Sequence, residues 1–217
     1  MLRSFLILCI AALPLAAQTS NTDANDPDAL WKELQGANLV YQGGTISWND
    51  LRQQRAATDV EDGQHPPVAI LSCADSRVPP ELIFKRDLAK IFVVRDAGNV
   101  ASNYDLASLE YAVSKGWTRL IIVMGHSRCG AVEAALAGDD NKLTPSLVEL
   151  TQRIRESFGS NWATPPSLED ATKRNARASA AWLPAHSALI RNAVRSGRVK
   201  ILAAYYNLGS GAVEEVR

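Results

Sequence analysis

The sequence predicts an α/β domain, in which a mostly parallel central β-sheet of four to five strands is flanked by helices. Four short, continuous apolar runs have the composition of strands that are buried on both faces. Segments with helical periodicity separate these runs, and such alternation is typical of a parallel sheet covered by helices. Two of the runs lead into cysteine-containing segments, and folds of this class place their sites at the carboxyl ends of strands. The four predicted strands cover residues 67–73, 91–95, 120–124 and 199–208.

The helical segments follow from apolar spacing and from capping residues. In residues 28–42, Leu30, Trp31 and Leu34 form an apolar face at helical spacing, and two glycines follow the segment. A Pro has no amide hydrogen to donate, so we expect the last helix to be interrupted at Pro184. The chain should then end in a short tail after the glycines near residue 210. The other predicted helices cover residues 47–57, 103–115, 129–137, 146–157 and 169–196.

The N-terminus has the three-part pattern of a secretory signal peptide. Arg3 precedes an apolar run of ten residues, 4–13, and small residues end at Ala17. Such a run is too short to span a bilayer, which takes about 20 residues. We therefore expect a signal peptide at 1–17, a polar leader at 18–27 and one folded domain at 28–217. The mature protein would be periplasmic or secreted and would have no membrane span.

Composition limits the classes of partner. The chain has 217 residues, with 23 Lys and Arg against 23 Asp and Glu, so its formal net charge is zero. Binding of nucleic acid through bulk positive charge needs a basic surplus, which is absent here. We expect no nucleic-acid partner, and the length suits a single domain with a full core.

Two cysteines remain once the signal peptide with Cys9 is removed. Cys73 and Cys129 would form one disulfide by default in an oxidising compartment. Alternatively, a metal ion holds both thiolates, or both are buried core thiols.

Four residue types that bind zinc occur at the two predicted strand ends. Cys73 and Asp75 follow the first strand, and His126 and Cys129 follow the third. Thiolate, imidazole and carboxylate groups are the ligands of tetrahedral zinc. Gly125 and Gly130 flank the second pair, where we expect close backbone approach to a metal, with the amides of residues 127, 128 and 130 donating to the Cys129 sulfur. This joint placement favours a metal site over a disulfide.

Arg77 distinguishes two kinds of metal site. With Asp75 as the fourth ligand, the site would be closed and structural. If Arg77 instead engages the Asp75 carboxylate in a bidentate pair, a site of two cysteines and one histidine keeps an open position for water. Zinc lowers the pKa of bound water from about 15.7 to about 7, and the carboxylate would orient the resulting hydroxide.

These residues resemble the signatures of the beta-class carbonic anhydrases. Residues 73–79 (CADSRVP) are similar to that family's C-x-D-S-R motif, and residues 125–130 (GHSRCG) to its G-H-x-x-C-G motif. Residues 94–99 (VRDAGN) resemble the segment between them, with Asp96 in place of the usual Asn. The resemblance extends over nearly the whole mature chain.

The resemblance implies reversible hydration of carbon dioxide to bicarbonate and a proton by a zinc-bound hydroxide, the activity of a carbonate dehydratase. It implies a homodimer or homotetramer, with the helix at 28–42 packing on a partner subunit. The implied zinc ligands are Cys73, His126 and Cys129, the implied dyad is Asp75 and Arg77, and the implied substrate-binding residues are Gln64, Phe92 and Tyr111.

Some members of the family have a regulatory bicarbonate site that stabilises a closed, Asp-ligated state. Its Trp position holds Ile70 here, and its other positions hold Arg95 and Tyr206. The regulatory site therefore looks incomplete, and we expect an open metal site near neutral pH.

Three other functions fit parts of the pattern. One is hydrolysis of a carbon dioxide analogue, carbon disulfide or carbonyl sulfide, by the same ligands. Another is a closed-site zinc-binding protein without catalysis. The third is a binding domain with a Cys73–Cys129 disulfide and no metal.

Overall fold

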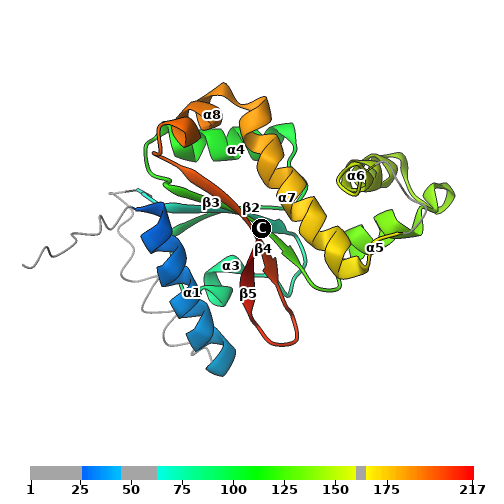
Figure 1. Cartoon of the computed structure of the whole chain (residues 1–217), viewed down its shortest axis with the longest axis horizontal. Helices are drawn as coiled ribbons and strands as arrows, with labels where there is room; N and C mark the ends of the chain where they lie inside the picture. The colour runs from blue at the N-terminus through cyan, green and yellow to red at the C-terminus, as the bar shows by residue number, and fades with distance from the viewer. Residues whose placement is uncertain (1–25, 45–62, 160–164) are drawn as a thin grey trace, which may run out of the picture.

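The computed structural model describes residues 26–44, 63–159 and 165–217. In these ranges, five strands form one sheet in the order β2-β1-β3-β4-β5 (Figure 1). β1 to β4 are parallel, whereas β5 runs antiparallel to β4. The predicted α/β class is confirmed. The strands are β1 (Val68–Cys73), β2 (Ile91–Asp96), β3 (Leu120–His126), β4 (Lys200–Tyr206) and β5 (Val213–Val216).

Helices cover both faces of the sheet. α1 and α3 lie on one face, and α4, α7 and α8 lie on the other (Figure 1). α5 and α6 pack on each other and on α7, beyond the carboxyl ends of the strands. The helices are α1 (Pro27–Gly43), α3 (Pro80–Ile83), α4 (Asn103–Ser114), α5 (Gly130–Ala137), the 3₁₀ turn η1 (Asp140–Lys142), α6 (Pro145–Glu156), α7 (Leu168–His186) and α8 (Ala188–Arg195).

The predicted elements agree with these bounds to within a few residues, with four exceptions. α3, η1 and β5 were not expected, and residues 213–216 form an edge strand where a tail was predicted. The predicted break at Pro184 is wrong, because Pro184 lies in the last turn of α7 and the helix continues to His186. The break comes at Ser187, whose hydroxyl oxygen accepts from the Ile190 amide and caps α8.

Some sequence predictions fall outside the described residues. These are the signal peptide, nearly all of the polar leader and the helix expected at 47–57. Within the described ranges, every helix is too short or too polar to cross a bilayer.

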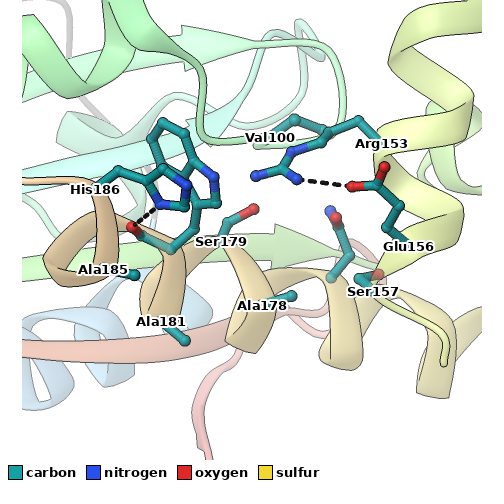
Figure 2. Close-up of a pocket in the computed structure, with 11 residues that line it drawn as sticks. Val100, Arg153, Glu156, Ser157, Ala178, Ser179, Ala181, Ala185 and His186 are labelled. Atoms are coloured by element: carbon teal, nitrogen blue, oxygen red, sulfur yellow. Dashed lines mark hydrogen bonds and ion pairs between the residues drawn. The ribbon is translucent and has the colours of Figure 1, made fainter.

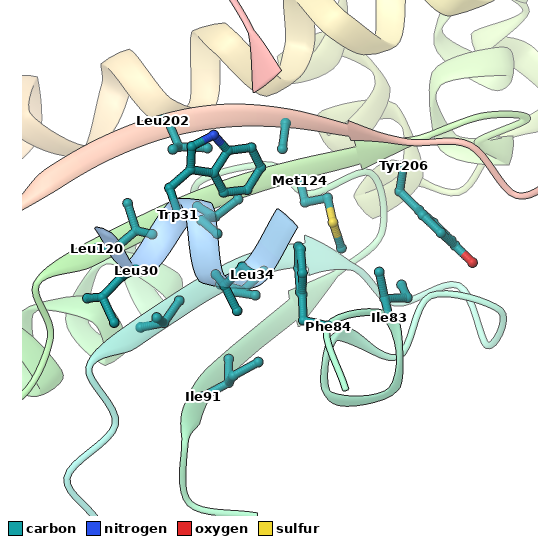
Figure 3. Packing of buried hydrophobic residues seen from close by; sticks show 14 of the residues in the cluster. Leu30, Trp31, Leu34, Ile83, Phe84, Ile91, Leu120, Met124, Leu202 and Tyr206 are labelled. Carbon is teal, nitrogen blue, oxygen red and sulfur yellow. The ribbon is translucent and has the colours of Figure 1, made fainter. Parts of the chain in front are cut away.

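The first helix packs on its own sheet. The Asp26 carboxylate caps α1 by accepting from the Ala29 amide at 3.1 Å. Leu30, Trp31 and Leu34 then lie in the core cluster between α1, α3 and the sheet (Figure 3). These three side chains are thus buried within the chain, and the packing of the helix on a partner subunit stays a prediction.

A buried polar side chain joins α1 to the end of the sheet. The Asn38 amide group donates to the carbonyl oxygens of Ile83 and Gly211, at 3.1 and 2.8 Å. Its oxygen accepts from the Val213 amide at 2.9 Å. Because unpaired polar atoms are unfavourable in a core, these bonds specify how α1, α3 and β5 meet.

The strand order creates a crevice where β1 and β3 end. The chain leaves β1 toward β2 on one side and leaves β3 toward β4 on the other. At such a switch point the two connections diverge and leave a crevice at the carboxyl ends of the strands, where ligands of this fold class bind. The described fold therefore brings the two cysteine-containing segments together at this edge.

Close packing of α7 on β3 predicts that Gly125 tolerates no side chain. A Cβ atom there would lie 2.8 Å from Cγ2 and 3.3 Å from the carbonyl oxygen of Thr172 on α7. The Thr172 hydroxyl donates to the Leu168 carbonyl oxygen at 2.8 Å, and this bond keeps the Thr172 methyl group, Cγ2, in its position. We expect Gly125→Ala to lower the free energy of unfolding by about 1–3 kcal/mol, measured by urea denaturation.

Gly130→Ala is the matched control, because no atom lies within 4 Å of a Cβ at that position. It should change the free energy of unfolding by less than about 1 kcal/mol, since Ala favours helix over Gly. Equal losses for the two variants would contradict the packing argument.

Candidate metal centre

Three potential zinc ligands meet in the crevice between β1 and β3. Cys73 is the last residue of β1, His126 is the last of β3, and Cys129 is the N-cap of α5. Their ligand atoms all lie within 4.8 Å of one another, and all three residues are buried. The pairing of β1 with β3 aligns the two strand ends and so sets this convergence.

The two sulfur atoms are too far apart for a covalent bond. Cys73 Sγ and Cys129 Sγ are separated by 4.0 Å, whereas a disulfide bond is about 2.05 Å long. Tetrahedral zinc with Zn–S distances of about 2.3 Å holds two sulfurs about 3.8 Å apart. The spacing therefore fits shared ligation to zinc and contradicts the predicted alternative of a disulfide.

The thiols titrate as a pair. The Cys129 thiol bonds the Cys73 sulfur, and this contact lowers the pKa of Cys73 to about 4 and raises the pKa of Cys129. Burial opposes the Cys73 shift and adds to the Cys129 shift, because it disfavours a charged sulfur. One thiolate thus forms readily, and the second needs a cation beside it.

His126 presents one ring nitrogen to the cluster. Its Nδ1 lies 2.9 Å from the Ser127 carbonyl oxygen, an acceptor, so Nδ1 carries the proton and donates. Nε2 is then the unprotonated nitrogen, and it is buried without a hydrogen-bond partner among the described residues. An unsatisfied buried polar atom costs roughly 1–3 kcal/mol, a cost that a metal bond to Nε2 would remove. The donor set therefore fits zinc.

Backbone groups support the sulfurs, but not those that the sequence suggested. The Gly98 amide donates to Cys73 Sγ at 3.3 Å, and its carbonyl accepts from the Asn175 side chain at 2.6 Å. Amides in the first turn of α5, at Ala131 and Val132, lower the pKa of Cys129. The predicted donation from the amides of residues 127, 128 and 130 is therefore replaced by other donors.

The glycine expectations change accordingly. Gly98 has φ +80°, and a Cβ there would lie 2.9 Å from Ile154 Cδ1 on α6, so the position needs glycine. Gly130 has open space around it, and the close approach predicted for Gly125 is to α7. Gly98 and Asn175 were missed as site residues; the only signal was the position of residues 94–99 at a strand end.

Asp75 and Arg77 form the predicted bidentate pair. Asp75 Oδ1 accepts from Arg77 Nε at 2.9 Å, and Oδ2 accepts from Arg77 Nη2 at 2.7 Å. The Arg77 amide also donates to Oδ1 at 2.9 Å. The Arg77 guanidinium holds the pKa of the Asp75 carboxyl well below its usual range. Asp75 therefore stays an anion beside the cluster, with Oδ2 3.9 Å from His126 Nε2.

The three predicted substrate-binding residues lie away from the cluster of their own chain. Gln64 is exposed and precedes β1, while the ligands follow the other end of that strand. Phe92 pairs with Ala69, four residues before Cys73, which is about 13 Å along a strand. Tyr111 on α4 contacts Phe92 at a ring-centroid distance of 6.5 Å. One chain therefore does not bring these residues to its own ligands.

These rings belong to an exposed group, which we term the aromatic patch. Tyr111 meets the ring of Trp117 edge-on at 5.6 Å, and Trp117 meets His65 at 5.7 Å. The Tyr111 side chain is 47% exposed. The aromatic patch, made of His65, Phe92, Tyr111 and Trp117, thus presents exposed His65 and Tyr111 beside partly buried Phe92 and Trp117.

Asp96, which replaces the usual Asn, is largely buried at the end of β2. Burial raises the pKa of its carboxyl to about 8, and the charge of Asp105 contributes to this shift. Oδ1 has no hydrogen-bond partner among the described residues. Near neutral pH the carboxyl is mainly protonated, so it offers a donor and an acceptor as an Asn amide would.

The positions of the regulatory bicarbonate site are occupied by other contacts. Ile70 lies in the core, and the Tyr206 hydroxyl lies 3.2 Å from that of Tyr41 on α1. Arg95 donates to backbone carbonyls of residues 73 and 75. Arg95 and Tyr206 thus bond groups of their own chain, and the incomplete anion site stays a prediction from the sequence.

A groove lies between α6 and α7 (Figure 2). It has a volume of about 310 Å³, and its walls include Arg153 and the stacked rings of Trp182 and His186. Asn175 lines it and donates to the carbonyl of Gly98, the residue whose amide bonds Cys73 Sγ. The three potential zinc ligands are not among the residues that line this groove.

Comparisons with known proteins agree with this geometry. Residues 68–213 match the family model described as carbonic anhydrase. The chain is 32% identical to a carbonic anhydrase of Mycolicibacterium smegmatis, covering 88% of this chain and 93% of that protein. It is 33% identical to carbonic anhydrase 2 of Mycobacterium tuberculosis, covering 86% and 91%.

A solved structure extends the likeness to the fold. The beta-carbonic anhydrase CcaA superposes with a TM-score of 0.64 at 27% identity, covering 87% of this chain and 93% of CcaA. The matched region contains all three potential zinc ligands, Asp75 and Arg77. From its sequence, its fold and the metal-ligand cluster at the carboxyl ends of β1 and β3, the chain belongs to the beta-class carbonic anhydrase family.

Proposed function

We propose that this protein catalyses the reversible hydration of carbon dioxide to bicarbonate and a proton, with Zn²⁺ as its cofactor. The observation that carries the proposal is the buried Cys73–His126–Cys129 cluster with an ionised Asp75 held beside it. Family membership supports the same activity, that of a carbonate dehydratase.

Cys73, His126 and Cys129 would hold the metal. When bound, zinc supplies a Lewis acid that brings the pKa of a coordinated water to about 7. The Asp75 carboxylate accepts the O–H of the nucleophilic water and turns its lone pair toward the substrate carbon. Arg77 keeps that carboxylate ionised and fixed, because it donates to both of its oxygens.

The contacts of Asp75 support an open site. Each carboxylate oxygen accepts a hydrogen bond from the Arg77 side chain, so ligation of a metal by Asp75 would compete with this pair. Arg77 thus leaves a coordination position for water, as a catalytic zinc site requires.

The activity is tested with zinc analysis and stopped-flow measurement of carbon dioxide hydration on the mature protein. Wild type should hold one zinc per chain and be active, because three ligands converge on one point. Cys73→Ser should lose zinc and activity together. Arg77→Ala should keep its zinc and lose roughly 100-fold in kcat, since it removes the orienting group but no ligand.

A metal-free, inactive wild type would overturn the proposal. If zinc-loaded wild type fails with carbon dioxide but hydrolyses carbon disulfide or carbonyl sulfide, that analogue is the substrate and carbon dioxide is not. Zinc without activity on any of these substrates would support a closed, structural site.

We further propose that the chain works as a homodimer, alone or paired into a homotetramer, in which one copy completes the pocket of the other. Phe92 and Tyr111 suit the apolar walls of a pocket for an uncharged, linear substrate, and Gln64 suits a hydrogen bond to it. Tyr111 belongs to the exposed aromatic patch, and Phe92 lies about 13 Å along a strand from Cys73. A second copy supplies the walls that one chain lacks.

Mixed oligomers test this arrangement. One variant carries Phe92→Ala and Tyr111→Ala, and the other carries Arg77→Ala; each should be nearly inactive alone. When the two are co-expressed, an intact zinc site in the first copy meets intact walls from the second. Statistical pairing should restore about one quarter of wild-type activity. No recovery in a confirmed mixed oligomer would show that each chain uses its own walls.

We propose export of the protein to the periplasm or the exterior, on the basis of the signal-peptide pattern at 1–17. Full-length protein expressed in a Gram-negative host should appear in the periplasmic fraction, shortened to begin at about Gln18, as read by mass spectrometry. A variant with two charged residues in the apolar run at 4–13 should stay uncleaved, because the run no longer inserts. Cytoplasmic, full-length wild type would contradict export.

A further inference from the structure

The chain leaves the sheet at the point where it carries its catalytic groups. β1 ends at Cys73, and the Ala74 amide donates to the Asp96 carbonyl at 2.6 Å as the chain departs from β2. The following residues, 74–77, form the loop that bears Asp75 and Arg77. The position of the Asp75 carboxylate therefore depends on what holds this short loop.

One side chain of the neighbouring strand reaches across to the loop. Arg95 on β2 donates from Nε to the Cys73 carbonyl at 3.0 Å and from Nη2 to the Asp75 carbonyl at 2.5 Å. The same Asp75 carbonyl also accepts from the Val78 amide at 3.0 Å. Arg95 thus fastens the backbone on both sides of Ala74, between a metal ligand and the dyad carboxylate.

We propose that Arg95 is a positioning residue for the metal site, one that fixes the loop and so aims the Asp75 carboxylate at the ligand cluster. Its importance for catalysis rests on the proposed function. The hydrogen bonds from Arg95 to the loop backbone are independent of that function, because they are present whatever the site binds.

The chemistry of the contact suits arginine. The guanidinium is planar, so Nε and Nη2 lie in a fixed fork, and one rigid group spans carbonyls two residues apart. No ion pair among the described residues includes Arg95, and its bonds to the loop both go to neutral backbone oxygens. Its role is therefore to set geometry, and a Lys at this position would reach one carbonyl at a time.

The geometry also separates Arg95 from Arg77. Arg77 bonds the Asp75 carboxylate, whereas Arg95 bonds the Asp75 backbone. Losing Arg77 frees the side chain alone, while losing Arg95 frees the loop, including the amide of Arg77 that donates to Asp75 Oδ1. The two variants should therefore differ in backbone protection.

The test compares Arg95→Met and Arg95→Lys with wild type by hydrogen exchange, read on peptides that cover residues 70–80. Met keeps most of the stem and removes both donors, so exchange at Ala74, Arg77 and Val78 should rise about tenfold or more. Lys should give an intermediate rise, because one bond can be kept. Arg77→Ala removes only the side-chain bonds to the Asp75 carboxylate, so exchange at residues 74, 77 and 78 should stay near the wild-type rate.

Arg191→Met is the matched control. Arg191 also donates to two consecutive carbonyls, those of Pro184 at 2.8 Å and Ala185 at 3.3 Å, where α7 meets α8. This variant should raise exchange near residues 183–190 and leave residues 70–80 at the wild-type rate. It should also leave kcat unchanged, since it lies outside the metal site.

Zinc release and turnover complete the measurement. Arg95→Met should bind one zinc but release it to a chelator severalfold faster, and its kcat should fall about tenfold at equal zinc content, with KM nearly constant. Wild-type exchange at residues 70–80 in Arg95→Met would overturn the proposal, as would an equal rise over the whole chain. An inactive wild type would refute the proposed function, while the exchange comparison would still decide the role of Arg95.

Discussion

The buried contact between two thiols and one imidazole is the constraint on which this structure depends. Two sulfurs lie 4.0 Å apart without a covalent bond, and a ring nitrogen beside them has no hydrogen-bond partner among the described residues. Such a cluster is unfavourable when empty, because one thiol keeps its proton and a buried nitrogen stays unsatisfied. A cation bound by both sulfurs and the ring nitrogen would stabilise the second thiolate and satisfy the nitrogen. Metal binding therefore explains why these three groups are buried together.

The rest of the fold delivers the three donors to one point. β1 and β3 must be adjacent and in register, because Cys73 and His126 each end a strand. α7 passes close to β3, and the absence of a side chain at Gly125 makes room for it. α6 covers Gly98, whose amide donates to Cys73 Sγ. Packing and chemistry are therefore coupled here: the helices that close the core also set the backbone that holds the sulfurs.

Charge is concentrated on one side of the cluster. Asp75 and Arg77 are paired beside it, whereas apolar Val100, Ile154 and Phe158 pack in one buried group with Cys73 and Cys129. The aromatic patch lies farther off, with Phe92 on β2 and exposed Tyr111 on α4. One chain therefore carries the ligand cluster and the aromatic patch as separate parts.

The sequence by itself determined the four parallel strands, the potential metal ligands and the dyad, because each depends on local pattern. Apolar runs predict buried strands, and Cys73, His126 and Cys129 stand out as rare residues at strand ends. The spacing of Asp75 and Arg77 was enough to suggest their pair. Only the tertiary structure decided which distant segments contact one another around the site. Helix α1 buries its apolar face on its own sheet, Gly98 and Asn175 reach Cys73 from distant elements, and Arg95 bonds a loop 20 residues away in sequence. These contacts join segments far apart in the chain, so they depend on how the layers pack, which no local spacing of residues encodes.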